Sequence, residues 1–281
     1  MPDEVINGYL MHYETYGQGP TLVMIHGGLG GGEGSAAMVE HHATILARHF
    51  RVIFYDRRGA GKSESPAGGY SLEGYAEDLH SLLLQLNVAQ AHILGSSAGG
   101  PIAMQFALDH SEMTETLILI NTMSYCQEAE RTVRQQELEQ IQVCQASEGD
   151  TAAAGEALEK RWPGLSRREP ARFEALLEAS EEQADAIGKT LQSYLDIGDS
   201  LESRLAELTM PTLIVHGDAD SRIPLACGRQ LQNSIPSSEM YIIPGAEHGL
   251  LSNEPRVVRN MIFQFLERFA PVSSSATTTR G

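Results

Sequence analysis

Short apolar runs alternate with longer stretches in which apolar residues recur at helical spacing. Four runs in the first 121 residues are almost free of polar side chains, namely residues 21–26, 51–56, 91–95 and 116–121. Continuous apolar runs of this length are typical of parallel strands that are buried on both faces of a sheet. Between them, residues 72–86 place leucine and tyrosine side chains on one helical face, and Ser71 precedes them as a possible helix cap. The pattern therefore predicts strands that alternate with helices.

The chain begins differently, with a predicted hairpin. Asn7-Gly8 lies between two short segments, residues 5–6 and 9–16, that favour strands. Asn-Gly is the dipeptide that best fits a two-residue hairpin turn. We therefore expect an antiparallel pair ahead of the parallel strands.

The alternation stops near Met123 and resumes at Pro211. The stretch between them is rich in Glu, Gln, Ala and Leu, for example at residues 131–143 and 172–182, and contains no clear strand. It predicts a mainly helical insertion. A strand at residues 212–216, a helix from about Leu225, a strand at 240–243 and a helix at 254–269 follow.

Together these elements predict an α/β fold: a doubly wound, mostly parallel sheet that carries an inserted helical cap. The predicted core consists of residues 1–122 and 208–271, and the cap of residues 123–207. Residues 272–281 have the composition of a flexible tail.

Composition and charge narrow the classes of partner. The 281 residues are 42% hydrophobic, enough for a large core, and the formal net charge is -17. An acidic chain without basic patches predicts no nucleic acid and no membrane partner. The N-terminal residues carry acidic rather than basic side chains and the apolar runs are short, so we expect a soluble, cytoplasmic protein. The cysteines Cys126, Cys144 and Cys227 lack paired spacing, which predicts neither disulfides nor a metal site and favours buried thiols.

The candidate chemistry begins at residues 95–99, which read Gly-Ser-Ser-Ala-Gly. This is a G-x-S-x-G motif, and it lies where a predicted strand passes into a predicted helix, as the motif requires. Ser97 occupies the nucleophile position and Ser96 the variable position before it. The flanking glycines fit a strained turn that has no room for side chains.

A serine nucleophile needs a base and an orienting acid. Asp220 follows the predicted strand at 212–216, and His248 follows the strand at 240–243, 28 residues later. Both would lie at carboxyl ends of strands, where ligands bind in open α/β sheets. The neighbouring Asp218 is the alternative acid.

Five motifs in this order resemble the α/β-hydrolase fold enzymes that carry a helical cap. They are the His26-Gly27-Gly28-Leu29-Gly30 loop, the segment from Asp56 to Ser63, the serine motif, the Gly217–Asp220 segment and Glu247-His248-Gly249. The resemblance implies Ser97 as nucleophile, His248 as base and Asp220 as orienting acid. It also implies that the backbone N–H groups of Gly28 and Ala98 form the oxyanion hole, and that no cofactor or metal takes part.

Two glycine-rich segments imitate nucleotide-binding loops: residues 27–34 resemble a dinucleotide loop, and residues 56–63 resemble a phosphate loop. The segment from Asp56 to Ser63 lacks the first glycine of a P-loop, because Asp56 stands in its place. We interpret it as a structural turn. We also interpret His26 as a structural residue, because we expect its imidazole to hold the loop that follows it.

The motifs indicate the type of bond that is cleaved but not the identity of the substrate. The predicted activity is hydrolysis of a small ester or lactone, with a small-molecule acyl substrate. A proline iminopeptidase is an alternative, although Leu29 and Ala98 depart from the proline and tryptophan of that family. Hydrolytic C–C cleavage and a receptor with little turnover are further alternatives. We expect Trp162 either to line the substrate pocket or to pack within the cap. The sequence does not indicate the oligomeric state.

Overall fold

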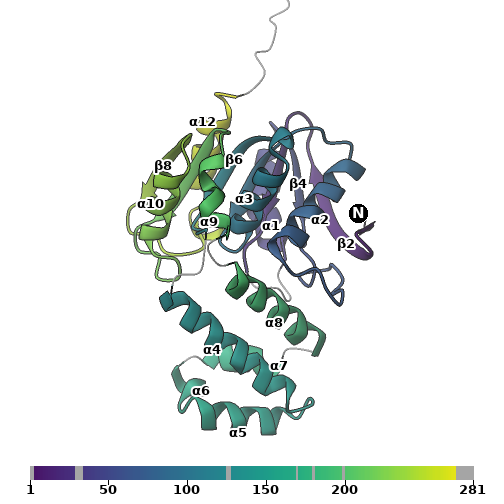
Figure 1. The fold of residues 1–281 in the computed structure, drawn as a ribbon, viewed down its shortest axis with the longest axis vertical. Coiled ribbons are helices and arrows are strands. Elements are labelled where there is room, and N and C mark those ends of the chain that lie inside the picture. The colour runs from purple at the N-terminus through teal and green to yellow at the C-terminus, as the bar shows by residue number, and fades with distance from the viewer. Residues whose placement is uncertain are drawn as a thin grey trace, which may run out of the picture.

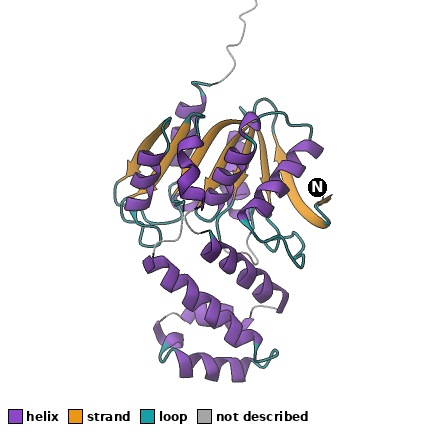
Figure 2. Ribbon diagram, viewed as in Figure 1, coloured by secondary structure: helices purple, strands orange, loops and turns teal. Residues whose placement is uncertain are grey.

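An eight-stranded sheet forms the centre of the molecule. The computed structural model describes residues 3–28, 34–124, 128–168, 170–178, 181–197 and 200–269. The strands are arranged in the order β1-β2-β4-β3-β5-β6-β7-β8; β2 pairs antiparallel with β1 and with β4, and all other neighbouring strands are parallel. Helices cover both faces (Figure 2). The predicted α/β class with a mostly parallel sheet is confirmed. The strands are β1 (Asp3–Ile6), β2 (Tyr9–Tyr16), β3 (Thr21–Ile25), β4 (Arg51–Tyr55), β5 (Ala91–Ser96), β6 (Thr114–Ile120), β7 (Thr212–Gly217) and β8 (Ser238–Ile243).

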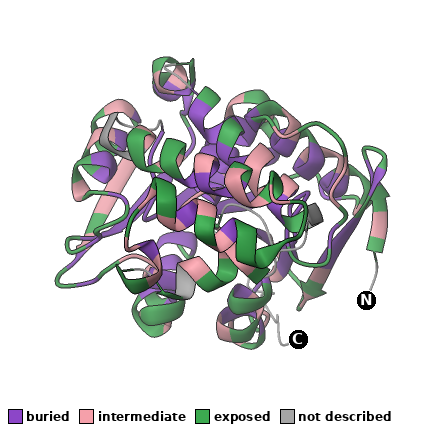
Figure 3. Ribbon diagram, turned by 90° about the horizontal axis from the view of Figure 1, so that it is seen from below, coloured by how far each residue is buried: buried purple, intermediate pink, exposed green. Residues whose placement is uncertain are grey.

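Each buried strand sends alternate side chains to two separate cores, as the period of a strand requires. In β3, Val23 and Ile25 belong to one core, which also includes residues of the helices α2 (Leu72–Gln85), α3 (Gly99–Asp109) and α10 (Leu225–Ser234). Leu22 and Met24 pack on the other face, against α1 (Ala36–Leu46), α11 (Leu250–Asn253) and α12 (Pro255–Leu266). Seen from below, buried residues gather in the strands and on the inner sides of these helices (Figure 3).

Local sequence signals explain several element ends. Asn7 and Gly8 both have positive φ, 47° and 86°, as a type I′ hairpin turn needs. The Ser71 hydroxyl accepts a hydrogen bond from the backbone N–H of Gly74 and caps α2. Both predictions are confirmed. The last predicted helix, at residues 254–269, corresponds to α12 (Pro255–Leu266), whereas the short α11 (Leu250–Asn253) ahead of it and helix α1 (Ala36–Leu46) were not predicted.

Helices of the inserted stretch lie beyond the carboxyl ends of the parallel strands (Figure 1). They are α4 (Glu128–Gln145), α5 (Thr151–Arg161), α6 (Leu165–Arg168), α7 (Pro170–Glu178) and α8 (Glu181–Asp196), and the short α9 (Ser200–Arg204) follows. Helices α4 and α8 share a small apolar core that includes Leu138, Ile141 and Leu191. Residues 272–281 and Cys126 lie outside the described residues, so the predictions for them stay predictions.

Two tyrosine hydroxyls connect α8 to the sheet layer. Tyr75 of α2 hydrogen-bonds Thr190 of α8 at 3.0 Å, and the Tyr194 hydroxyl donates to the carbonyl of Ala98. Helix α8 is thereby held directly over the start of α3. Among the described residues, no helix combines the length and the apolar character that crossing a membrane requires.

Candidate active site

The turn between β5 and α3 is strained and tightly packed. Ser97 has a φ of 51°, in the left-handed region that residues other than glycine rarely adopt. A Cβ on Gly99 would lie 2.4 Å from the carbonyl oxygen of Ile25, and one on Gly100 would lie 2.0 Å from the Thr122 hydroxyl. The glycines after Ser97 are therefore needed because the backbone of β3 and the side chain of Thr122 lie against this turn.

Three predicted side chains meet at the carboxyl ends of β5, β7 and β8. The Ser97 Oγ lies 3.0 Å from His248 Nε2, and His248 Nδ1 lies 2.8 Å from Asp220 Oδ2. Asp218 does not take part, because its carboxylate accepts a hydrogen bond from the Gly245 N–H at 2.6 Å. The structure thus brings together the serine, the histidine and the carboxylate that the sequence motifs singled out.

The environment of Asp220 keeps it ionised. Burial raises its pKa, but hydrogen bonds from His248 and from the backbone N–H groups of Ile223 and Arg222 outweigh burial, so that the pKa lies below its ordinary value. An ionised Asp220 accepts a hydrogen bond from the N–H group at His248 Nδ1. His248 Nε2 then carries the lone pair that faces the Ser97 hydroxyl.

Asn121 connects the acid and histidine loops, and no sequence motif indicated it. It follows β6 and is 2% exposed. Its Oδ1 accepts from the Gly217 N–H at 3.0 Å and its Nδ2 donates to the Glu247 carbonyl at 3.2 Å. The amide therefore fixes the loops that carry Asp220 and His248 relative to each other.

The loop after β3 brings a backbone donor beside Ser97. The Gly27 carbonyl accepts hydrogen bonds from His26 Nδ1 at 2.7 Å and from Arg57 Nη2 at 3.0 Å. In a trans peptide the C=O and N–H groups point in opposite directions. The Gly28 N–H is therefore held pointing away from Arg57. Gly28 and Ala98, the two predicted oxyanion-hole residues, line one pocket with Ser97.

His26 is buried and neutral. Burial, and secondarily the charge of Arg57, lowers its pKa to about 3. Its Nε2 accepts from the Arg57 N–H at 3.2 Å while Nδ1 donates to Gly27. The structure agrees with the interpretation that this imidazole holds the loop.

The Asp56–Ser63 segment is a turn built around a carboxylate. Asp56 accepts from the backbone N–H groups of Ser35 at 2.6 Å and Lys62 at 2.9 Å. These N–H groups are the kind that would bind a phosphate in a phosphate loop. The carboxylate already occupies them, in agreement with a structural turn.

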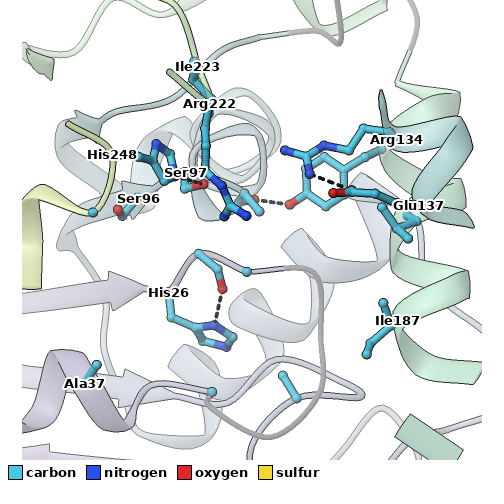
Figure 4. Close-up of a pocket in the computed structure, with 18 of the residues that line it drawn as sticks. His26, Ala37, Ser96, Ser97, Arg134, Glu137, Ile187, Arg222, Ile223 and His248 are labelled. Atoms are coloured by element: carbon cyan, nitrogen blue, oxygen red, sulfur yellow. Dashed lines mark hydrogen bonds and ion pairs between the residues drawn. The ribbon is translucent and has the colours of Figure 1, made fainter. Parts of the chain in front are cut away.

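Ser97 and His248 open into a pocket of about 560 Å³ beneath α4 and α8. Ile141, Leu176, Ile187 and Leu191 of the insertion supply apolar walls, and Arg134, Glu137 and Arg222 supply charged ones (Figure 4). Trp162 is not among the described lining residues. Cys144, expected to be a buried thiol, lines the pocket instead, because this turn of α4 faces the space over Ser97; Cys227 is buried.

Metal-ligating side chains gather elsewhere in the described part of the chain. Glu77, His80 and His110 place one ligand atom each within 4.8 Å of one another, and none of them lines the pocket. Asp220 and His248 are bonded to each other. The pocket itself offers the Ser97 hydroxyl, the His248 imidazole, the Cys144 thiol and the charged side chains of the two walls.

Comparison with known proteins identifies the family to which this chain is similar over most of its length. The family model described as serine aminopeptidase, S33, matches residues 20–256. A relative from Metapseudomonas resinovorans, named 2-hydroxy-6-oxo-6-(2'-aminophenyl)hexa-2,4-dienoic acid hydrolase, is 26% identical over 96% of this chain and 91% of its own length.

Two solved structures are similar over nearly the whole chain. A hydrolase from Pseudomonas aeruginosa PA01 has a TM-score of 0.74 and 27% identity, and the match covers 94% of this chain and 97% of that one. An alpha/beta hydrolase enzyme, MGS-M2, from a Medee basin deep-sea metagenome library has a TM-score of 0.75 at 20% identity and shares the fold. That match covers 95% of this chain and 97% of the other.

Proposed function

The chain belongs to the serine aminopeptidase S33 family and is a hydrolase of the α/β-hydrolase fold, and on that premise we propose that it cleaves a small ester or lactone through an acyl-enzyme intermediate. The observation that carries this proposal is the continuous hydrogen-bonded series from Ser97 through His248 to Asp220. In the proposed reaction Ser97 is the nucleophile, His248 the base and Asp220 the orienting acid.

The proposed first half-reaction uses these contacts in order. His248 Nε2 takes the Ser97 proton as Oγ forms a bond to the substrate carbonyl carbon. The resulting oxyanion accepts hydrogen bonds from the N–H groups of Gly28 and Ala98. The Ala98 N–H lies at the positive, N-terminal end of helix α3. His248 then returns the proton to the departing alkoxide oxygen, which leaves an acyl group on Ser97.

Water completes the cycle. His248 takes a proton from the water while the water oxygen attacks the acyl carbon. As the second tetrahedral intermediate collapses, the bond from the acyl carbon to Ser97 Oγ breaks, His248 returns the proton to Oγ, and the free acid leaves. In a lactone the alkoxide and the acid belong to one molecule, so the product is a hydroxy acid. In a protease, removal of one oxyanion-hole donor, a side-chain amide, lowers kcat by about 10²–10³.

Proline iminopeptidase activity is a second candidate because Glu137 provides a carboxylate in the pocket. Such an enzyme needs an acidic group for the substrate amine, and Glu137 lines the cavity over Ser97. Glu137 already accepts a hydrogen bond from Arg134 at 2.8 Å, which weakens its attraction for an amine. Release of 4-nitroaniline from proline 4-nitroanilide would favour this candidate over the ester hydrolase.

Hydrolytic C–C cleavage and a receptor with little turnover also remain proposals. The relative from Metapseudomonas resinovorans is named a hydrolase of a hexadienoic acid, which keeps the first alternative in view. The receptor alternative predicts ligand binding without an activated serine.

Labelling with a fluorophosphonate tests the proposal at the nucleophile. We expect peptide mass spectrometry to find the probe on Ser97, because only an activated hydroxyl attacks such a phosphonate quickly. The His248→Ala variant should lose the labelling, and His49→Ala, which removes an exposed imidazole outside the pocket, should retain it. A folded protein that remains unlabelled would contradict the hydrolase mechanism and favour the receptor.

A further inference from the structure

The charged side chains that line the pocket are mainly positive, whereas the whole chain has a negative net charge. The sequence has 37 acidic and 20 basic residues. Among the described residues that line the pocket, the side chains with a permanent charge at neutral pH are Arg134, Glu137 and Arg222. Two guanidinium groups and one carboxylate give these lining side chains a net charge of about +1.

Arg134 lies in a largely buried ion pair that fixes its direction. Its Nη1 donates to Glu137 Oε2 at 2.8 Å, and the two side chains are only 16% and 10% exposed. The bond uses one of the five N–H donors of the guanidinium. Arg134 extends from α4 toward the space in front of Ser97 (Figure 4). Glu137 therefore orients Arg134 while further donors face the cavity.

Arg222 approaches from the opposite wall. Its backbone is held by the bond from its N–H to Asp220 Oδ1 at 2.9 Å, so the start of its side chain is fixed beside His248. The side chain runs from the loop after β7 into the pocket, facing Arg134 (Figure 4). Within the described parts of the chain, no carboxylate forms an ion pair with it.

A third guanidinium adds positive potential behind the Gly27-Gly28 loop. Arg57 is 1% exposed. In the described structure it donates only to neutral groups, the carbonyls of Gly27 and Gly28 and the Tyr194 hydroxyl. A buried cation whose partners are uncharged attracts an anion that enters the neighbouring cavity.

We propose that the substrate of this site carries a carboxylate besides the bond that is cleaved, and that Arg134 and Arg222 bind this carboxylate from the two walls. The inference rests on the proposed ester or lactone hydrolysis. Guanidinium groups pair with carboxylates through directed, charge-assisted hydrogen bonds, so two arginines in the pocket fit a carboxylate ligand.

Matched pairs of esters test the proposal. The first pair is 4-nitrophenyl hydrogen glutarate and its methyl ester, which differ only in a carboxylate on the acyl side. The second pair is 4-acetoxybenzoate and its methyl ester, which place the carboxylate on the leaving group. We expect the carboxylate member of one pair to have a kcat/KM at least about tenfold higher than its neutral partner.

The variants should change that ratio in opposite directions. Arg134→Gln and Arg222→Gln should each lower the ratio about 10- to 100-fold, since each removes charged donors to the carboxylate. Glu137→Gln should raise it, because it removes the competing carboxylate. Arg131→Gln is the matched control: it removes the same charge one helical turn earlier on α4, outside the pocket lining, and should leave the ratio unchanged.

Two other results are possible. If both members of each pair react equally and the arginine variants leave the ratios unchanged, the carboxylate inference is overturned and ester hydrolysis stands. If the folded enzyme hydrolyses none of the four esters and does not react with the fluorophosphonate, the proposed function fails and the inference fails with it.

Discussion

At the scale of single residues, Ser96 and Ser97 have the same side chain but different backbones. Ser96 ends strand β5 with extended geometry, whereas Ser97 has the positive φ of the turn. Only the Ser97 Oγ lies within hydrogen-bonding distance of His248 Nε2, at 3.0 Å. The strained backbone conformation therefore selects which hydroxyl can be activated.

Alanine substitutions separate the two serines. We expect Ser97→Ala to lower the kcat for a 4-nitrophenyl ester about 10⁴-fold or more, because the nucleophile is lost. Ser96→Ala should keep a substantial part of the activity, since it removes a hydroxyl that does not contact the base. Initial rates with both purified variants, checked for folding by circular dichroism, measure the difference. The reverse order of activities would assign the nucleophile to Ser96.

At the scale of elements, the turn from β5 to α3 depends on how closely the chain segments approach. We expect Gly99→Ala to lower the free energy of unfolding by about 1–3 kcal/mol, because its Cβ would overlap the carbonyl oxygens of Ile25 and His26 at 2.4 and 2.8 Å. Backbone atoms of β3 cannot move aside without disturbing the sheet. Urea unfolding curves of the variant and the wild type measure the change.

Gly68→Ala is the control for that substitution. Gly68 is exposed, its φ is not positive and nothing lies within 4 Å of the position of its Cβ. Its substitution should change the unfolding free energy by no more than about 0.5 kcal/mol. Equal effects of the two substitutions would contradict the close approach at Gly99.

The elements that the sequence predicted are those whose signal is local. Buried strands such as β3 read as apolar runs, and the hairpin at Asn7-Gly8 and the cap at Ser71 depend on neighbouring residues alone. Helix α1 escaped prediction because His42, which is fully buried, reads as polar in an already short apolar stripe. Its burial depends on the Leu251 carbonyl, 209 residues away, to which His42 Nε2 donates.

The residues of the candidate site also separate into those with a local sequence signal and those without one. Ser97, Asp220 and His248 could be located because each lies in a short motif at the end of a strand. Arg134, Tyr194 and Asn121 could not, since their roles depend on which side of an element faces a distant loop. A helical pattern gives the faces of α4 and α8 but not the direction in which they pack over the sheet.

At the scale of the whole molecule, buried histidines link stability to pH. Burial is the main cause that lowers the pKa of His26 to about 3 and of His42 and His92 to about 4, so all three are neutral in the folded chain near neutral pH. In the unfolded chain a histidine titrates near about 6.5. Below that pH the unfolded chain binds more protons than the folded chain, and the free energy of unfolding decreases as pH falls.

The contribution of these histidines is complete above about pH 6.5 and is lost as pH falls toward about 4, by up to about 1.4 kcal/mol per pH unit for each group. Urea unfolding at several pH values between 6.5 and 4.5 should show this decrease. His42→Gln keeps a donor for the Leu251 carbonyl and removes the titration, so its unfolding free energy should fall less steeply with pH than that of the wild type. The pKa of Asp220 lies below the ordinary aspartate value, so the stability that its ionised form contributes is lost at a more acidic pH than this window. Identical slopes in the wild type and His42→Gln would mean that His42 does not contribute to the pH dependence and that other titrating groups cause the acid sensitivity.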